Sequence, residues 1–548
     1  MQGSGALPLR WWQTRWFVAA MALVAAIPLL WPDIPPLVDL PGHMGRYRVQ
    51  LAHDQVPWLA HWYNFDWQLI GNLGIDLLIE PLEPLIGLEP AVKLIVIAIP
   101  VLIATGLLWI AREVHGRIPA TALFALPIVY SFPLHFGFVN FALSMGLALN
   151  AFGLWLHLAR VNRLRLRAAL FVPIGLIIWV CHTYGWGLLG VLAFSGELIR
   201  QWDMHTNWRD RWWKAPFWAG VHCLSLFPPV MLMLAWRSGG HVGGTTGDWF
   251  NWRAKMQWFT MIFRDRWELF DMATLAASLL VMVYGARHPR IEYSRHLTIS
   301  ALFLLVVYLV LPRIVFGSAY ADMRLAPFVL GIALLALRPK PGATVRHAAL
   351  LAAAGLTFFG ARIAATTYSF WLYDRSYDRE LAALDHLPEG ARLLTFVGET
   401  CRYEWTMSRL EHIPGIALSR KLAYSNDQWS MAGAQLLTVR YPGARGFNHD
   451  PSQIVTDVKC AREWWRPIAV SLVRFPRDAF DYVWVVQPPA YHRRLEAGLI
   501  PVWRSGTSAL FRVDDRARAP ELMMQDLGPY GPEMRDRVNA INALNRTS

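Results

Sequence analysis

The strongest constraint on this chain is a series of long apolar segments that recurs through its first 365 residues. A helix needs about 20 mostly apolar residues to cross the hydrocarbon core of a membrane. Hydrophobic residues make up 55% of the chain and charged residues only 17%, against roughly 25% charged residues in soluble proteins. This composition excludes a disordered chain and an ordinary soluble enzyme. It predicts an α-helical polytopic membrane protein with about 11 transmembrane helices, at 16–31, 91–111, 119–133, 138–159, 168–183, 185–199, 215–236, 269–286, 297–312, 325–337 and 347–365.

Lysine and arginine residues between these segments predict the orientation of the chain. With the N-terminus inside, the inside loops hold 18 of them, whereas the outside loops before residue 366 hold 9 over a greater length. Because cytoplasmic loops carry the excess of Lys and Arg, we expect a bacterial cytoplasmic (inner) membrane protein with a cytoplasmic N-terminus. An odd number of spans places the C-terminal domain outside. The net charge of +13 lies mostly in these short loops, so it does not indicate a nucleic-acid partner.

After residue 366 the sequence changes from apolar helical segments to alternating helix-like and strand-like segments. The runs LLTFV and YVWVV are short, β-branched and aromatic, which is typical of buried strands. We predict three regions: a transmembrane domain over 1–365, an extracytoplasmic α/β domain over 366–515 and a polar C-terminal tail over 516–548.

The first outer segment, 32–90, contains the motif PDIPPLVDLPGHMGRYRVQLAHD. A helix that begins near Pro41 would carry one polar stripe of residues three or four apart, namely Asp39, His43, Arg46, Gln50 and His53. We expect an amphipathic helix at the membrane surface. Two interpretations stay open: a catalytic or metal-binding cluster that faces an outer cavity, or an Asp39 that merely caps a helix with a solvated polar face.

Other polar residues lie at predicted outer ends of the spans. These are His135, Asn140, His182, Tyr184, Arg313, Asp322 and Arg324. Ionisable groups at membrane depth are costly and are therefore candidates for function, although a structural histidine or an interfacial arginine is the plainer explanation for each one alone. All of them are predicted on the same side of the membrane as Asp39. The Gly-rich stretch 239–248 precedes no strand and helix, so we interpret it as a flexible outer loop.

The layout around VDLPGHMGRYRV resembles that of the C-type (GT-C) membrane glycosyltransferases. In that family an essential acid follows the first helix, with an amphipathic helix, many spans and often an outer soluble domain after it. The resemblance implies a polyprenyl-phosphate sugar donor and sugar transfer on the outer face of the membrane. It implies Asp39 as the catalytic residue, with His43 and Arg46 on the attached helix. Many members of the family carry two acidic residues close together in this segment, whereas here the nearest acid before Asp39 is Asp33. A divalent cation is therefore left open as a cofactor.

The chemistry of such a donor favours particular binding residues. Arg324, Arg313 or His182, with Tyr184 beside it, would hold the lipid phosphate by charge-assisted hydrogen bonds. Asp39 would take the proton from a hydroxyl of an envelope glycan, lipid or protein acceptor, and a one-step displacement would invert the anomeric centre. The alternatives are a transporter or flippase, a structural subunit of an envelope-biogenesis complex, and a ligase that uses diphosphate donors.

Cys401 and Cys460 are the only pair of cysteines predicted in the outer domain. Because the outside of the cell is oxidising, we predict that they form a disulfide. Cys181 and Cys223 fall in or near predicted spans and are expected to pack as small apolar groups.

Overall fold

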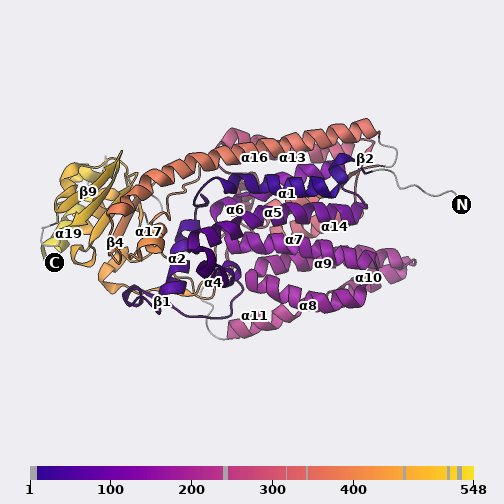
Figure 1. The fold of residues 1–548 in the computed structure, drawn as a ribbon, viewed down its shortest axis with the longest axis horizontal. Helices are drawn as coiled ribbons and strands as arrows, with labels where there is room; N and C mark the ends of the chain where they lie inside the picture. Colours follow the sequence, from indigo (N-terminus) through magenta and orange to yellow (C-terminus); the bar gives the residue numbers. More distant parts are fainter. Residues whose placement is uncertain are drawn as a thin grey trace.

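The computed structural model describes residues 9–238, 245–315, 317–340, 344–460, 465–514, 519–527 and 533–547. A helical part occupies one end of an elongated molecule and a sheet-containing domain the other (Figure 1). In chain order, the helical part contains α1 (Arg15–Leu30), α2 (Leu40–Ala52), α3 (Leu59–Trp62), α4 (Gly74–Ile86), α5 (Leu88–His115), η2 (Ala120–Tyr130), α6 (Phe132–Phe136), α7 (Val139–Arg160), α8 (Leu164–Cys181), α9 (Thr183–Met204), α10 (Trp208–Cys223), α11 (Pro228–Ser238), α12 (Trp252–Thr260), α13 (Glu268–Arg287), α14 (Arg295–Val310), α15 (Ala326–Leu335) and α16 (Val345–Leu381).

The chain is a multi-pass membrane protein by the length and composition of its helices. Five described helices are long and apolar enough to cross a membrane: α5, α7, α8, α13 and α16. A sixth span arises if Trp208–Leu226 and Pro228–Ala235, which meet at a bend of 62°, count as one. Four shorter apolar helices accompany them, including α1 and α14. The total of about 11 spans and the orientation in the membrane therefore stay predictions.

The helices pack around one continuous apolar core that is centred on α5 and α7. Small residues let these two helices approach closely: a Cβ added to Gly106 would lie 2.6 Å from Cβ of Leu149, and one added to Gly146 would lie 2.8 Å from Cβ of Leu102. Close approach through small residues is how membrane helices gain packing contacts without a hydrophobic driving force. α16 packs against η2 and α1 and continues into the C-terminal domain (Figure 1). The predicted domain boundary at residue 366 thus falls inside a helix.

The C-terminal domain is built on a six-stranded mixed sheet. Its strands, in spatial order, are β7 (Arg466–Pro467), β6 (Ile454–Thr456), β4 (Leu393–Gly398), β8 (Tyr482–Val486), β10 (Ser508–Val513) and β9 (Leu499–Ser505). The pairs from β7 to β8 are parallel, whereas β10 runs antiparallel to both of its neighbours. Strands covered on both faces read as continuous apolar runs, which explains why LLTFV and YVWVV form the central strands β4 and β8.

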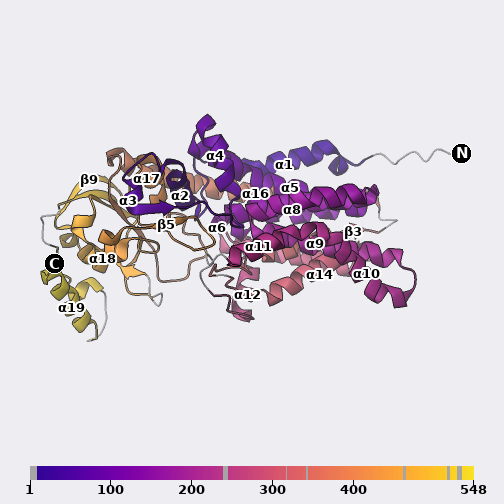
Figure 2. The same cartoon turned by 90° about the horizontal axis from the view of Figure 1, so that it is seen from below.

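Helices α17 (Pro414–Lys421), α18 (Ile468–Arg474) and α19 (Glu533–Thr547) complete this domain (Figure 2). Between β8 and β9 the chain forms a short 3₁₀ turn, Arg493–Glu496. The described parts of the predicted polar tail include α19, whose Val538 and Ile541 are buried.

Several contacts join the first outer segment to this domain, among them a strand pair and a helix pair. β1 (Tyr63–Phe65) pairs antiparallel with β5 (Leu437–Val439). α2 lies against α17, and Arg48 Nε donates a hydrogen bond of 3.1 Å to the carbonyl oxygen of Ser419. The segment that carries Asp39 is therefore held between the helical part and the C-terminal domain.

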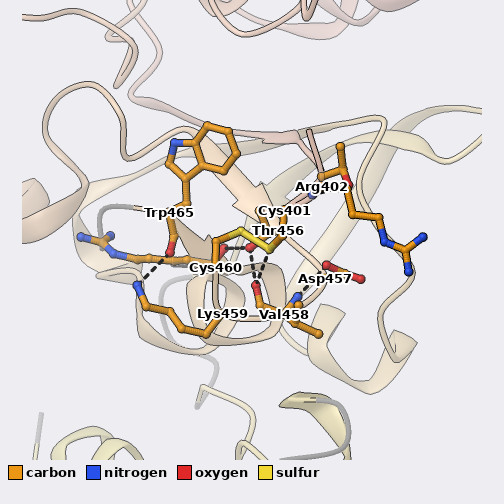
Figure 3. Close-up of a disulfide and its surroundings, with 10 residues drawn as sticks. Cys401, Arg402, Thr456, Asp457, Val458, Lys459, Cys460 and Trp465 are labelled. Carbon is orange, nitrogen blue, oxygen red and sulfur yellow. Dashed lines mark hydrogen bonds between the residues drawn. A yellow bond between two sulfur atoms is a disulfide. The ribbon is translucent and has the colours of Figure 1, made fainter. Parts of the chain in front are cut away.

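A disulfide joins Cys401 and Cys460 (Figure 3), which confirms the pairing predicted from the sequence. The bond connects the segment after β4 to the segment after β6 across a separation of 59 residues. Cys401 Sγ also lies 3.5 Å from the carbonyl oxygen of Val458. Cys181 is free and buried, and Cys223 is free and half-buried.

We predict that the disulfide stabilises the C-terminal domain. Cross-linking restricts the unfolded chain, so replacing both Cys401 and Cys460 by serine should lower the free energy of unfolding by about 2–4 kcal/mol. The readout is the melting temperature of the purified protein with and without reductant. Cys223→Ser, which removes a free thiol, is the matched control. Equal melting of the double variant and the wild type would contradict the prediction.

Candidate active site

A cavity of about 600 Å³ lies between the helical part and the C-terminal domain. Its walls come from the start of α2, the segment before α4, the turn between α6 and α7, the break between α8 and α9, and the segment before α15. The C-terminal domain contributes residues 411–412, 429–435 and 449–454. Parts of the chain that are hundreds of residues apart therefore face one cavity.

Asp39 occupies the N-cap position of α2, and its side chain makes no capping hydrogen bond. The backbone N–H of Asp39 instead donates 3.0 Å to the carbonyl oxygen of Phe136. Gly137 permits this close approach, since its φ is +102° and a Cβ there would lie 2.6 Å from the Asp39 nitrogen. The backbone of Asp39 is thus fixed while its half-buried carboxylate lines the cavity. This geometry does not support the capping interpretation.

Only the first turn of α2 faces the cavity. His43 lines it together with Asp39, whereas Arg46 forms a buried ion pair with Asp76. Gln50 continues this contact with α4, donating 2.9 Å to the carbonyl oxygen of Asp76. The first residues of the polar stripe therefore face the cavity, and the later ones contact α4.

Most residues of α2 are buried, so the helix does not present the solvated polar face of an amphipathic surface helix; its position relative to the membrane surface stays a prediction. Two glycines allow the C-terminal domain to cover α2: a Cβ added to Gly45 would lie 2.9 Å from the carbonyl oxygen of Gly415 in α17, and one added to Gly42 would lie 2.7 Å from the Trp429 ring.

Arg324 is a cation on the wall of the cavity that the helical part contributes. Its guanidinium lies 4.2 Å from the ring centre of Phe138 and 5.6 Å from that of Tyr184. Nearby Asp322 is engaged by Lys255, whose Nζ lies 3.1 Å away. Within the described ranges, no carboxylate oxygen lies within ion-pair distance of Arg324, and its Nε is buried without a hydrogen-bond partner. The aromatic rings hold the guanidinium in place and leave its charge available to a ligand.

His182 and Tyr184 stand beside Arg324 at the break between α8 and α9. His182 Nδ1 accepts a hydrogen bond of 3.1 Å from the backbone N–H of Tyr184. The neutral imidazole must then carry its proton on Nε2, so the ring can donate a hydrogen bond without being charged. A phosphate at this end would meet one fixed cation and one neutral donor.

The C-terminal domain supplies a second set of titratable groups that sequence reasoning missed. Glu411, His412 and Asp450 line the cavity together with Trp429. Glu411 and His412 belong to the connection that follows β4, at the carboxyl end of a parallel strand, where ligand-binding residues of such sheets gather. Their position after a parallel strand was the sequence signal that could have identified Glu411 and His412. It does not indicate which outer loop these residues contact.

The charges around Asp39 oppose one another. Burial raises the pKa of Asp39 to about 7, against the effect of the nearby His412 cation. Glu411 and Asp450 raise the pKa further, and Arg324 lowers it. Burial alone would lower the pKa of His412, but Asp427, with Asp450 and Asp39, raises it to about 10. Near neutral pH, His412 is therefore a cation, and Asp39 is present in both its protonated and its ionised form.

A buried ion pair fixes the approach of the C-terminal domain to this site. Arg409 Nη2 donates 2.5 Å to Oδ1 of Asp265, in the turn before α13, and lies 3.1 Å from His135 Nδ1. The same guanidinium donates to the carbonyl oxygen of Pro36. Arg409 thus ties the segment before His412 to the segment before Asp39.

The structure brings five of the seven sequence-predicted site residues to the cavity and leaves two outside it. Those that line it are Asp39, His43, His182, Tyr184 and Arg324. Arg46 lies behind His43 in its ion pair with Asp76. Arg313 pairs with Asp248 at 3.2 Å. Of the Gly-rich stretch, residues 239–244 lie outside the described residues.

The described part of the chain contains no group of three or more His, Cys, Asp or Glu side chains arranged to hold a metal ion. Asp33, the nearest acid before Asp39, does not line the cavity. Its backbone N–H donates a hydrogen bond of 3.1 Å to Asp374 Oδ1. The residues present therefore do not fit the divalent cation that the family resemblance left open.

The sequence matches no protein-family model and no curated protein. Among solved structures, the fold is similar to that of ArnT from Cupriavidus metallidurans bound to undecaprenyl phosphate, with a TM-score of 0.43 and 13% identity over 94% of this chain and 99% of that one. It is also similar to the arabinofuranosyltransferase AftD from mycobacteria, with a TM-score of 0.42 and 15% identity over 92% of this chain. The matched region spans 40% of the AftD chain.

Proposed function

We propose that this protein is a membrane glycosyltransferase that moves a sugar from a polyprenyl-phosphate donor to a hydroxyl acceptor on the outer face of the cytoplasmic membrane. The observation that carries the proposal is the meeting of Asp39 and Arg324 on the walls of one cavity. The cation would hold the donor phosphate, and the carboxylate would take the acceptor proton. Both groups lack the ion-pair partners that occupy other charged residues of the described chain.

Arg324 and His182 suit the phosphate of a lipid-linked sugar. As the bond between the sugar C1 and the phosphate oxygen breaks, the phosphate leaves with one additional negative charge. A fixed guanidinium stabilises that developing charge, and a planar fork of donors matches the phosphate oxygens. Phe136, Phe138 and Phe141 line the same end of the cavity, which favours a donor that enters with an apolar chain.

Asp39 is placed to act as the general base. In its ionised form it would accept the proton of an acceptor hydroxyl while that oxygen forms its bond to C1. A base with a pKa close to the working pH combines a large ionised fraction with good proton affinity, and the pKa of Asp39 is about 7. A single displacement of this kind inverts the anomeric centre.

We predict that Asp39→Asn abolishes sugar transfer without destabilising the protein. Asparagine has nearly the same shape but cannot accept the proton, so kcat should fall by about 10²–10⁴-fold. The assay follows transfer of labelled sugar from a lipid extract by the purified protein. The melting temperature should stay at the wild-type value even for Asp39→Ala, because the side chain caps no backbone N–H. A folded Asp39→Asn protein with near wild-type transfer would contradict the role.

We predict a pH profile for transfer that reports on Asp39. The base is active when ionised, so kcat/KM should be constant above about pH 7 and fall tenfold per pH unit below it. The donor is a phosphodiester and does not titrate in this range, so the inflection belongs to the protein. The measurement is kcat/KM between about pH 5 and 9, with polyprenyl-phosphate binding followed in parallel. A rate that stays constant down to pH 5 would exclude Asp39 as the base.

We predict that Arg324 binds the lipid phosphate. Hydrogen bonds to charged groups contribute about 1.5–3 kcal/mol, so Arg324→Ala should weaken binding of polyprenyl phosphate by roughly 10- to 150-fold. Arg324→Lys, which keeps the charge and loses the planar fork, should lie in between. Arg253→Ala, which removes an exposed arginine of α12, is the control and should bind like the wild type. Unchanged binding by Arg324→Ala would refute the assignment.

A further inference from the structure

Four consecutive polar residues of the C-terminal domain, directly before Trp429, are fully buried. They are Ser425, Asn426, Asp427 and Gln428, each 0% exposed. A buried polar group is costly unless it finds a partner, so the partners of this run show what it holds in place. Asn426 exchanges two hydrogen bonds with the backbone of Thr395 in β4. Asp427 instead faces His412, which lines the cavity.

Asp427 is bound by neutral groups on one side and by His412 on the other. Its Oδ1 accepts hydrogen bonds of 2.7 Å from Ser425 Oγ and 3.1 Å from Gln428 Nε2. Its Oδ2 has no hydrogen-bond partner and lies 3.5 Å from Nδ1 of His412. Because a buried carboxylate needs a cation beside it, the imidazole of His412, which is only 6% exposed, is held against Asp427 in its charged form.

The same group of residues is attached to the first turn of α2. Gln428 Nε2 also donates 3.1 Å to the carbonyl oxygen of Gly42. Gly42 leaves room for this contact, since a Cβ there would lie 3.2 Å from His412 Nδ1 and 2.7 Å from the Trp429 ring. Gly42 comes three residues after Asp39, which places both on one face of the helix. The imidazolium therefore packs against the turn that carries the proposed base.

Asp39 meets charges of both signs, and His412 has the largest effect among them. His412 and Arg324 favour the ionised carboxylate, whereas burial, Glu411 and Asp450 favour the protonated one. After burial, the charge of His412 has the strongest influence on the pKa of Asp39. A change in that charge is therefore the change in the surrounding side chains to which Asp39 responds most.

The charge of His412 depends in turn on the carboxylates that face it. Asp427, Asp450 and Asp39 raise its pKa to about 10 in spite of its burial. His43 also faces it from α2 but is neutral, because burial and neighbouring cations lower its pKa well below the usual value. Asp39 and Asp450 line the cavity, whereas Asp427 is buried behind it. Asp427 therefore keeps His412 charged even while Asp39 carries a proton.

We propose that His412, held as a cation by Asp427, is a positioning residue that keeps the carboxylate of Asp39 ionised for sugar transfer. This inference rests on the proposed transferase function and names the residue pair that regulates its base. His412 takes no proton in the reaction. The proton of the acceptor hydroxyl moves to Asp39, and the imidazolium stabilises the ionised form that accepts it.

The test compares the pH profile of kcat/KM for sugar transfer in the wild type and in His412→Gln, which removes the charge and keeps a polar side chain. Loss of the cation should move the inflection of the profile upward by about one pH unit. Transfer near about pH 7 should then fall by about fivefold, whereas near about pH 9 it should return close to the wild-type rate. Reduced transfer at every pH with an unchanged inflection would show a merely structural role and overturns the inference. A wild-type protein without transfer overturns the transferase function itself.

A double variant removes the ion pair without leaving an unbalanced charge. His412→Gln alone leaves Asp427 buried without its cation, which is destabilising. His412→Gln combined with Asp427→Asn removes both charges, so the protein should keep a cooperative melting transition and show the same upward shift of the inflection. His386→Gln changes an exposed histidine of the same domain that does not line the cavity, and it should keep the wild-type profile. A folded double variant with the wild-type inflection overturns the inference.

Discussion

An ion pair between Arg409 and Asp265 inside the protein connects the segments on both sides of the cavity. Arg409 is 1% exposed and Asp265 2%, and the guanidinium also reaches His135 and the carbonyl oxygen of Pro36. Asp265 accepts a further hydrogen bond of 3.0 Å from Ser369 of α16. Removing one partner of such a pair leaves an unbalanced buried charge and costs roughly 3–5 kcal/mol. The pair therefore fixes the C-terminal domain on the helical part, with Glu411 and His412 held two and three residues beyond Arg409.

A second buried network holds the opposite wall. Arg46 pairs with Asp76, and Asn140 Nδ2 donates 3.1 Å to the other carboxylate oxygen of Asp76. Asn140 also accepts 2.7 Å from the backbone N–H of Ile75, so α2, α4 and α7 share one set of hydrogen bonds. Hydrogen bonds and ion pairs are stronger in a low-dielectric interior than in water, so this network favours one arrangement of the three helices. Arg46 thus acts on the position of α2, which carries His43 and Asp39.

Much of this structure could be predicted from local sequence. The apolar runs indicated where helices such as α5 and α7 lie, and YVWVV indicated β8, because hydropathy and side-chain size act over a few residues. The disulfide was predictable because Cys401 and Cys460 were the only candidates in one compartment. The helix that begins after Asp39 was predictable from its Pro and its polar spacing.

The partners of these elements were not predictable in the same way. Arg46 lies seven residues beyond Asp39, about 10 Å along the helix axis at 1.5 Å per residue, so two residues of one stripe can meet different neighbours. His412 and Asp450 reach Asp39 from more than 370 positions away in the sequence. No local pattern records such a contact. Pairing across the chain, and the burial of α2 that depends on it, are properties of the tertiary structure alone.

The aspartates of this protein differ in their surroundings, and the difference supports the proposed role of Asp39 as a base. Asp76 and Asp265 are buried beside arginines, and His135 and Arg409 hold the pKa of Asp265 below its usual value in spite of its burial. A carboxylate bound in this way is a poor proton acceptor, because taking the proton would break its ion pair. Asp39 is placed between Arg324 and His412, which favour its ionised form, and Glu411 and Asp450, which oppose it. Burial raises the pKa of Asp39 to about 7, and these opposing charges adjust it, because the helical part and the C-terminal domain meet at this residue.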